Sequence, residues 1–161
     1  MPAGLQHEIG KKKPFDVPEV EAGLNLIRTV SALADDFETL FREHGISGAA
    51  YNVLRILRGA GPNGRMCHQI GTDMITRVPD VTRLVDRLER AGLAQRRRCD
   101  KDRRVVHVKI TTKGLEVLAR LDRPTVELHR RQLGHLTRAE LAELNRLLVK
   151  ARTSPKGPPK D

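Results

Sequence analysis

Residues 76–114 constrain the fold more strongly than any other part of the chain. In their first half, apolar side chains recur at the three- and four-residue spacing of an amphipathic helix, at Val81, Leu84, Val85, Leu88 and Ala91. Gly92 follows where a left-handed residue commonly ends a helix. Two arginine-rich segments, 93–98 and 103–110, then flank a short turn and predict a two-stranded ribbon. A helix beside a basic ribbon suits duplex DNA, because one element can enter a groove while the other holds the neighbouring backbone.

The charge of the chain favours a polyanionic partner. The sequence carries a formal net charge of +10. Residues 65–113 hold 13 Lys/Arg and 6 Asp/Glu, so a net charge of +7 falls in the predicted binding unit. A basic surface that only aids solubility is the alternative. The chain has no Trp, one Tyr and three Phe, too few for the stacking platforms of single-strand and RNA binders, which favours double-stranded DNA.

The sequence disfavours several other classes of protein. No apolar run is long enough for a transmembrane helix and the N-terminus lacks the apolar core of a signal peptide, so we expect no membrane contact and a cytoplasmic location. Cys67 and Cys99 make neither a disulfide framework nor a zinc site, and no metal or cofactor is predicted. Without a phosphate-binding glycine loop or a nucleophile motif, an enzyme is not expected.

The ends of the chain are predicted to differ from its middle. Residues 1–18 are expected to form a flexible basic arm and residues 153–161 a disordered tail. Long apolar helices at about 20–44 and 112–151 have surface to spare, since a core of three helices and a ribbon can bury itself. Packing this surface against a second copy is economical, although the helices could instead fold back on their own core. The residues assigned to the dimer contact are Leu24, Ile27, Leu141, Leu144 and Leu148.

Several local signals place the helix boundaries. Ser47 is positioned to cap the start of one helix, and the residues from Thr137 to Glu140 have the capping-box pattern of another. The glycine- and proline-rich residues 59–64 predict a turn. Pro124 lies inside a long helical pattern, and we expect it to kink or split that helix.

Three parts of the sequence resemble the MarR family of winged-helix transcriptional regulators. Residues 79–93 read PDVTRLVDRLERAGL and resemble the family's recognition helix and the start of its wing. Residues 100–104, DKDRR, followed by residues 110–114, ITTKG, resemble its wing turn and the helix start after the wing. Ile46 and Ser47, with YNVL at residues 51–54, are similar to the opening of its second helix.

The resemblance implies a mainly α fold with a small β-wing. It places a winged helix-turn-helix core at about residues 46–111 of a single domain spanning 19–152, with N- and C-terminal dimerisation helices. It further implies a homodimer with recognition helices in adjacent major grooves, and repression that a small molecule or oxidation often relieves. Oxidation-sensing members carry a cysteine in the first-helix region, whereas no cysteine precedes Cys67 here, which argues against that form of sensing.

The polar face of the predicted recognition helix, with the residues before it, is expected to contact DNA. The residues assigned to this contact are Arg77, Pro79, Asp80, Thr82, Arg83 and Arg87. An arginine can donate two hydrogen bonds to guanine in the major groove. Free backbone N–H groups at a helix start favour a phosphate.

The predicted wing supplies a second DNA-binding set, namely Arg97, Lys101, Arg103 and Arg104. Arg103 is the main candidate for the minor groove, because a narrow groove concentrates negative potential. Asp100 and Asp102 are expected to orient the wing arginines by ion pairing. Strand side chains alternate, so at most two of the arginines at 96–98 can meet DNA on one side.

A small-molecule effector would bind near the dimer helices, as in relatives. The candidate lining residues are Phe37, Phe41, His44 and Tyr51, and ordinary core packing is the alternative for each. Two other functions stay open. One is an architectural protein that binds DNA without sequence preference, and the other is a redox-responsive regulator using Cys99, whose thiolate the nearby arginines would favour.

Overall fold

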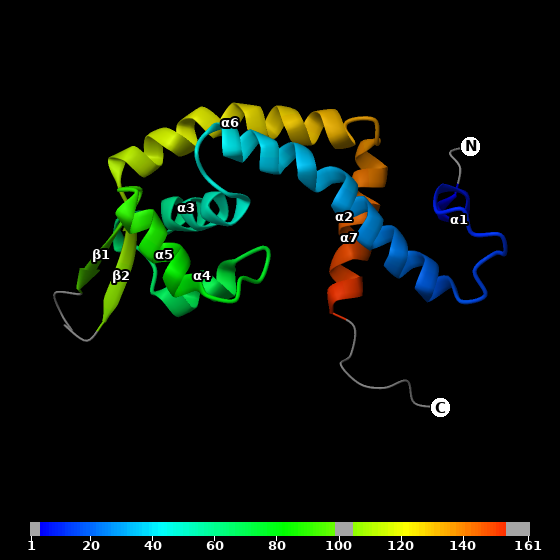
Figure 1. The fold of residues 1–161 in the computed structure, drawn as a ribbon, viewed down its shortest axis with the longest axis horizontal. Helices are drawn as coiled ribbons and strands as arrows, with labels where there is room; N and C mark the ends of the chain where they lie inside the picture. The colour runs from blue at the N-terminus through cyan, green and yellow to red at the C-terminus, as the bar shows by residue number, and fades with distance from the viewer. Residues whose placement is uncertain (1–3, 99–104, 154–161) are drawn as a thin grey trace. The chain divides into compact units, whose positions relative to one another are not determined.

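The computed structural model describes residues 4–98 and 105–153, most of which are helical (Figure 1). In chain order the elements are α1 (Leu5–Glu8), α2 (Pro18–Glu43), α3 (Gly48–Ala60), the 3-10 turn η1 (Gly61–Asn63), α4 (Cys67–Asp73), α5 (Val81–Arg90), strands β1 (Ala94–Arg98) and β2 (Val106–Ile110), α6 (Thr112–Leu133) and α7 (Arg138–Arg152). The chain divides into two compact units, and the boundary falls inside α6 after Thr125. A mainly helical chain with a small antiparallel ribbon confirms the predicted fold class.

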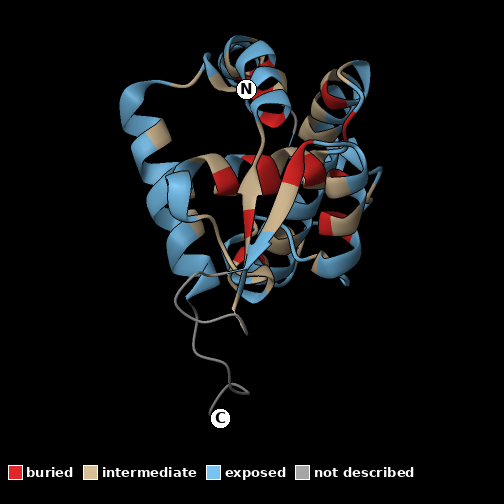
Figure 2. Cartoon of the chain, turned by 90° about the vertical axis from the view of Figure 1, so that its left-hand side faces the viewer, coloured by how far each residue is buried: buried red, intermediate tan, exposed pale blue. Residues whose placement is uncertain are grey.

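The first unit contains a packed core built from α3, α4, α5 and the ribbon. Helix α5 packs on α3, α4 and β1, and α3 also contacts β2. The side chains with no exposed surface are Val53, Leu54, Leu57, Ile70, Val85, Val108, Leu118 and Leu121. Burying each such side chain stabilises the fold by about 1.5–3 kcal/mol relative to leaving it in water. In Figure 2 the buried positions lie where the elements face one another, whereas the far end of the ribbon is exposed.

Two predicted helix starts are confirmed by their hydrogen bonds. The Ser47 hydroxyl accepts a bond from the backbone N–H of Ala50 at 3.2 Å and so caps α3. At α7, the Thr137 hydroxyl accepts from the N–H of Glu140 at 3.3 Å, and the Glu140 carboxylate accepts from the N–H of Thr137 at 2.7 Å. These bonds satisfy donors that the first turn of a helix leaves free, so the local sequence fixes where both helices begin.

The ribbon is widened by a contact that the sequence did not predict. The N–H of Arg65 donates to the carbonyl of Val108 at 3.0 Å, and the carbonyl of Arg65 accepts from the N–H of Val108 at 2.8 Å. Gly64 allows this approach, because its φ is +70° and a Cβ there would clash with the Val108 carbonyl oxygen. Residues 59–64 therefore do more than turn the chain, since they bring the following residue onto the free edge of β2.

Helix α6 settles one of the two outcomes expected at Pro124. It runs from Thr112 to Leu133 without a break, so Pro124 does not split it, and a kink there stays a prediction. A proline in a helix removes one backbone hydrogen bond and crowds the preceding turn. Leu121 and Leu128 are buried on either side of the proline, and this burial offsets the local cost.

The predicted N-terminal arm also contains structure. Residues 5–8 form α1, and the Leu5 side chain is buried. The Glu8 carboxylate pairs with the guanidinium of Arg28 on α2 at 2.6 Å. Part of the arm is thus tied to α2. At the other end, residues 154–161 of the predicted tail lie outside the described residues.

The buried hydroxyl of Thr125 gives a first testable prediction. Thr125 is buried on α6, and its Oγ1 has no hydrogen-bond partner among the described residues. A buried polar group without a partner costs about 1–3 kcal/mol. We expect Thr125→Val, which keeps the branched shape, to raise the free energy of unfolding by about 1 kcal/mol in urea denaturation at fixed protein concentration. Thr125→Ala should lower it through lost packing, and a destabilised valine variant would show that the hydroxyl is satisfied.

Candidate nucleic-acid interface

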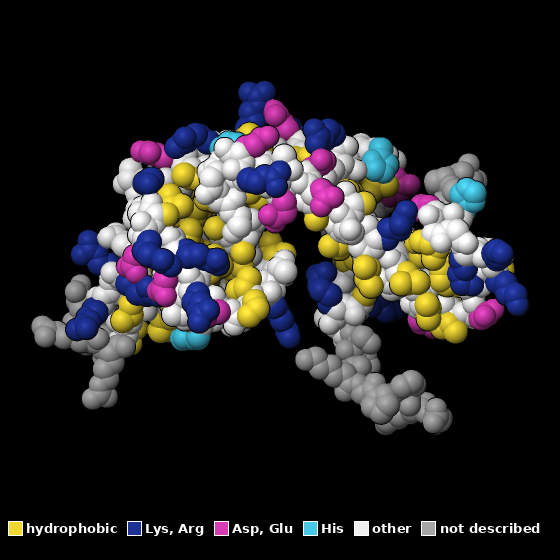
Figure 3. All heavy atoms as spheres, in the orientation of Figure 1, with side chains coloured by type: hydrophobic (Ala, Val, Ile, Leu, Met, Phe, Trp, Pro, Cys, Tyr) yellow, Lys and Arg dark blue, Asp and Glu magenta, His cyan; other side chains and the backbone are white. Residues whose placement is uncertain are grey.

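Helix α5 is held by its apolar side and leaves its charged side exposed. Its buried residues are Leu84, Val85 and Leu88, as the predicted apolar arc requires. Ala91 departs from that arc, because it follows the last helical residue and is exposed just before Gly92 turns the chain with a φ of +72°. The exposed residues on the other side include Thr82, Arg83 and Arg87. Figure 3 shows dark-blue Lys and Arg side chains gathered over the part of the molecule that contains α5.

The start of α5 is occupied by the side chain of Asp80. Its Oδ1 accepts a hydrogen bond from the backbone N–H of Arg83 at 2.9 Å, which makes Asp80 the N-cap. Its Oδ2 lies 3.2 Å from Nε of the same Arg83. The sequence suggested that free N–H groups here favour a phosphate, but one of these donors is already used by Asp80. Asp80 is therefore placed to fix the helix start and the Arg83 side chain.

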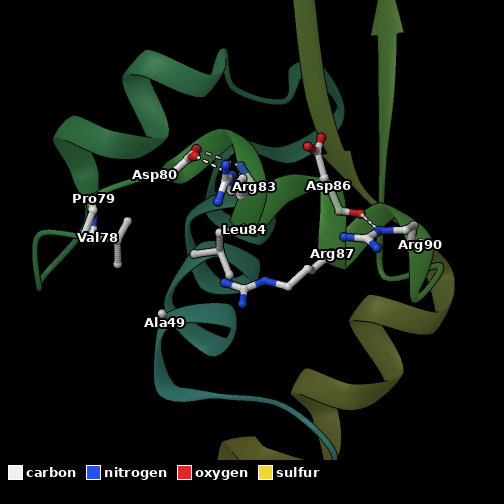
Figure 4. A pocket seen from close by; sticks show the side chains of 9 residues that line it. All are labelled: Ala49, Val78, Pro79, Asp80, Arg83, Leu84, Asp86, Arg87 and Arg90. Atoms are coloured by element: carbon white, nitrogen blue, oxygen red, sulfur yellow. Dashed lines mark hydrogen bonds and ion pairs between the residues drawn. The ribbon is translucent and has the colours of Figure 1, made fainter.

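A hollow of about 370 Å³ adjoins the outer face of α5. Its lining residues are Ala49, Val78, Pro79, Asp80, Arg83, Leu84, Asp86, Arg87 and Arg90. Figure 4 shows the Arg87 side chain extending across the front of α5 toward Ala49, near the start of α3. Nε of Arg90 donates to the backbone carbonyl of Asp86 at 3.4 Å. Within residues 4–98 and 105–153, the Arg87 guanidinium has no hydrogen-bond or ion-pair partner and is free to meet an external anion.

The segment between α4 and α5 is anchored to α3. The backbone N–H of Ile75 donates to Oδ1 of Asn52 at 2.8 Å. This bond leaves the Ile75 side chain 89% exposed, and Arg77 and Pro79 are exposed as well. The predicted contact residues Arg77 and Pro79 are thus accessible, on a segment that a hydrogen bond ties to α3.

Arg96 joins the ribbon to α5 through a network of three contacts. Its guanidinium lies 2.7 Å from the Asp86 carboxylate and 2.6 Å from the Glu89 carboxylate, and its backbone N–H donates to Glu89 at 2.9 Å. The backbone hydrogen bond, followed by the side-chain bond, lowers the pKa of Glu89 below its ordinary value of 4.5. We call these three residues the Arg96 clamp. It sets the position of β1 relative to the exposed face of α5.

Sequence reasoning missed the Arg96 clamp. Of the three arginines at 96–98 only Arg97 was assigned a role, and no partner was predicted for Arg96. A signal was present, because Asp86 and Glu89 are three residues apart and share one side of a helix, where they can hold one cation between them. Arg97 and Arg98, in contrast, are exposed, opposite His107 and Val106 of β2.

The turn of the predicted wing cannot be placed. Arg97 is described, but the other assigned wing residues, Asp100, Lys101, Asp102, Arg103 and Arg104, lie outside the described residues, as does Cys99. Their roles stay predictions. The structure does show that both strands reach toward this turn from a base fixed by the Arg96 clamp.

The end of α5 is fixed by the residues that follow β2. The hydroxyl of Thr111 donates to the carbonyl of Gly92 at 2.7 Å, and Nζ of Lys113 donates to the carbonyl of Ala91 at 2.9 Å. A cation is favourable at the C-terminus of a helix, where carbonyl groups point outward. Gly114 completes the junction, because a Cβ there would clash with the carbonyl of Leu93. The resemblance at residues 110–114 therefore has a physical basis in how α6 begins.

Apolar side chains remain exposed on α2. Leu24 is 39% exposed and Ile27 is 69% exposed. Val20 and Val30 are exposed as well, by 50% and 68%. These residues recur at helical spacing along the N-terminal half of α2. On α7, Leu144 is exposed, while Leu141 and Leu148 are half-buried. Both sets of residues assigned to a dimer contact thus keep apolar surface that a partner can cover.

Comparisons with known proteins identify the family. The family model described as the MarR family matches residues 46–106. The HTH-type transcriptional repressor IacR of Pseudomonas putida is 30% identical over 123 residues, which cover 76% of this chain and 72% of the repressor. The chain belongs to the MarR family. It is a transcriptional regulator and not an enzyme. The resemblance to this family that the sequence indicated is therefore confirmed.

Solved structures agree with this placement. A MarR transcription factor from Planctomyces limnophilus is 42% identical, has a TM-score of 0.64, and is matched over 84% of this chain and 98% of its own. BpsR of Bordetella bronchiseptica, described in terms of regulation of its DNA binding by 6-hydroxynicotinic acid, has a TM-score of 0.76 at 21% identity, over 89% of this chain and 100% of its own. The second similarity shows the MarR fold alone.

Three of the four residues predicted to line an effector site of this MarR protein form one aromatic cluster. The rings of Phe41 and Tyr51 stack with centroids 4.4 Å apart, and Phe37 lies 6.0 Å from Phe41. Nδ1 of His44 lies 2.9 Å from the carbonyl of Leu40. Phe41 is buried, whereas the other three candidates are half-buried. Phe37, Phe41 and Tyr51 are brought together, but the hollow beside α5 is lined by other residues. The role of all four candidates in ligand binding stays a prediction.

Two other kinds of feature, a metal site and a membrane-spanning helix, are absent from the described residues. In residues 4–98 and 105–153, no group of three or more His, Cys, Asp and Glu side chains could hold a metal ion, and Cys67 is a half-buried free thiol. No helix of the same residues is long and apolar enough to cross a membrane.

Proposed function

We propose that this MarR protein is a homodimeric repressor that binds a pseudo-palindromic operator in double-stranded DNA. The observation that carries the proposal is the exposed face of α5 with Thr82, Arg83 and Arg87, tied by the Arg96 clamp to a basic ribbon. Helix α5 would enter the major groove, and Arg97 with the wing residues Lys101, Arg103 and Arg104 would hold the flanking backbone and minor groove. Arg77 and Pro79 would lie against the backbone beside the helix start. Such a protein would act in the cytoplasm with the DNA that it binds.

A second copy completes the proposed reader. The exposed apolar residues of α2, including Leu24 and Ile27, and those of α7, including Leu144, support a dimer contact. Two recognition helices placed about 34–36 Å apart would read half-sites separated by one turn of duplex. Two linked half-sites also multiply the affinity, because the second contact becomes intramolecular.

We further propose that a small aromatic molecule releases the repressor from DNA. The cluster of Phe37, Phe41 and Tyr51 supplies ring faces, and the Tyr51 hydroxyl a polar edge, suited to such a molecule, with His44 three residues after Phe41 as a further candidate. The reported effect of 6-hydroxynicotinic acid on BpsR supports the same chemical class. Tyr51→Ala should then weaken the response to an effector without changing DNA affinity in its absence.

Selection from random duplexes tests the proposed function. Bound sequences are enriched with the full-length protein, and affinities for the best duplex and a scrambled duplex of equal length are measured by fluorescence anisotropy at about 150 mM salt. We expect a ratio of about 10³ or more, with two chains per duplex and a palindromic consensus. A ratio near one would instead support an architectural protein. Loss of binding on mild oxidation, absent in Cys99→Ser, would support redox regulation.

A further inference from the structure

Asp80 places a negative charge on the surface that is proposed to face DNA. The Asp80 side chain is 46% exposed and that of Arg83 is 85% exposed, so neither is buried in the core. A carboxylate beside phosphates is repelled, and at physiological salt this repulsion extends over about 8 Å. A helix cap does not need that charge, because Ser and Asn cap helices about as well as Asp does. The choice of an acid at this position therefore calls for a role beyond capping.

The contacts of Asp80 suggest that role. One oxygen caps α5 through the backbone N–H of Arg83, and the other lies 3.2 Å from Nε of Arg83. A guanidinium has five N–H donors, and an ion pair on the Nε side leaves the four donors of the two terminal nitrogens. Those donors form the planar fork that matches O6 and N7 of guanine. Figure 4 shows Asp80 and Arg83 joined by these contacts at the start of α5.

We propose that Asp80 is a specificity-determining residue that positions Arg83 to read guanine. The proposal rests on the proposed function and names how the site discriminates between sequences. With its Nε side toward Asp80, Arg83 presents its fork to a base edge and is kept from the nearest phosphate. The carboxylate repels the DNA backbone in every complex, and a guanine that engages Arg83 offsets this cost. Asp80 thus lowers binding to all sequences while favouring one, which is how repulsive elements create specificity.

The other charges of α5 are arranged differently. Its two further carboxylates, Asp86 and Glu89, are both bound by Arg96. Arg90 contacts only a neutral backbone carbonyl among the described residues, and Arg87 has no partner there. Arg83 is the arginine on the exposed face of α5 whose guanidinium is held by a carboxylate of the same helix start. Base reading by Arg83 and backbone contact by Arg87 follow from that difference.

The test separates the charge of Asp80 from its capping role. Asp80→Asn keeps an oxygen for the cap but removes the charge and places an amide group against Nε of Arg83. The matched control is Glu143→Gln on α7, since Glu143 and Arg146 form an exposed ion pair at the same three-residue spacing, with the acid first. Each variant is measured with the selected operator, with a scrambled duplex, and with an operator carrying 7-deazaguanine at each guanine in turn. Asp80→Ser provides a second variant that retains a cap.

We expect Asp80→Asn to reduce the ratio of operator to scrambled affinity by about 10-fold or more while binding to the scrambled duplex stays equal or tightens. Removing N7 of one guanine per half-site should weaken the wild-type protein and Glu143→Gln strongly, and Asp80→Asn much less. If both Asp80 variants retain the wild-type ratio, or lose operator and scrambled binding equally, Asp80 is only a cap and the proposal is wrong. A wild-type ratio near one would overturn the proposed function itself, and the role of Asp80 with it.

Discussion

Arg83→Ala is expected to weaken operator binding by about 30-fold or more and to leave binding to a scrambled duplex within about threefold. One bidentate contact between arginine and guanine contributes about 1–3 kcal/mol of discrimination. A dimer makes the contact twice, so the loss should reach about 2–6 kcal/mol. The substitution leaves the cap of α5 in place, because Asp80 accepts the hydrogen bond from the backbone N–H of residue 83. Fluorescence anisotropy with both duplexes measures the two affinities.

Arg87→Ala provides the matched comparison, one helical turn later on the same exposed face. Its guanidinium has no partner among the described residues and extends toward the start of α3, which suits a contact with the DNA backbone. We expect this variant to weaken operator and scrambled binding by the same factor. It should also reduce the slope of log affinity against log salt by about 2 per dimer. If Arg83→Ala weakened both duplexes equally and Arg87→Ala only the operator, the two roles would be reversed.

The sequence predicted the fold because the relevant signals are local. The apolar spacing of α5, the Ser47 cap and the Thr137–Glu140 capping box each act within a few residues, and each is confirmed. The continuity of α6 could not be predicted in this way. Whether a helix continues through Pro124 depends on burial by residues distant in sequence. The local sequence shows only that a proline in a helix is unfavourable.

The candidate site was predicted by position but not by contact. The assignment of Thr82, Arg83 and Arg87 to an exposed face followed from helical geometry, and the structure places them there. The partner of each charge is a tertiary property. Asp80 was grouped with residues that meet DNA, and no partner was predicted for Arg96, whereas Asp80 caps α5 and Arg96 binds the carboxylates of the clamp. The sequence contains many arginines. Only the packed structure distinguishes those that pair with carboxylates of the same chain from those that stay available to DNA.

Arg96→Met should have a large effect on DNA binding, because it removes the Arg96 clamp. The substitution keeps most of the apolar length of the side chain but leaves Asp86 and Glu89 as neighbouring carboxylates without their cation. The Arg96 side chain is 26% exposed, so the free energy of unfolding should fall by only about 1–3 kcal/mol, less than for a fully buried pair. Operator affinity should fall by about 10-fold or more, because the ribbon loses its fixed position beside α5 and two negative charges face DNA. Urea denaturation and anisotropy measure the two effects.

Arg98→Met is the matched control, because Arg98 lies two residues later on β1 and is exposed without a partner among the described residues. It removes the same charge and should change the stability by less than about 0.5 kcal/mol.

At low pH, the difference in the free energy of unfolding between wild type and Arg96→Met should disappear. The folded pKa of Glu89 is lowered, so its stabilisation is complete above its ordinary pKa of 4.5 and is lost as the pH falls through the folded value. Equal DNA affinities for the two variants would show that Arg96 acts through its charge alone and does not position the ribbon. A stability difference that persists at low pH would show that the ion pairs with Asp86 and Glu89 do not account for the stabilisation.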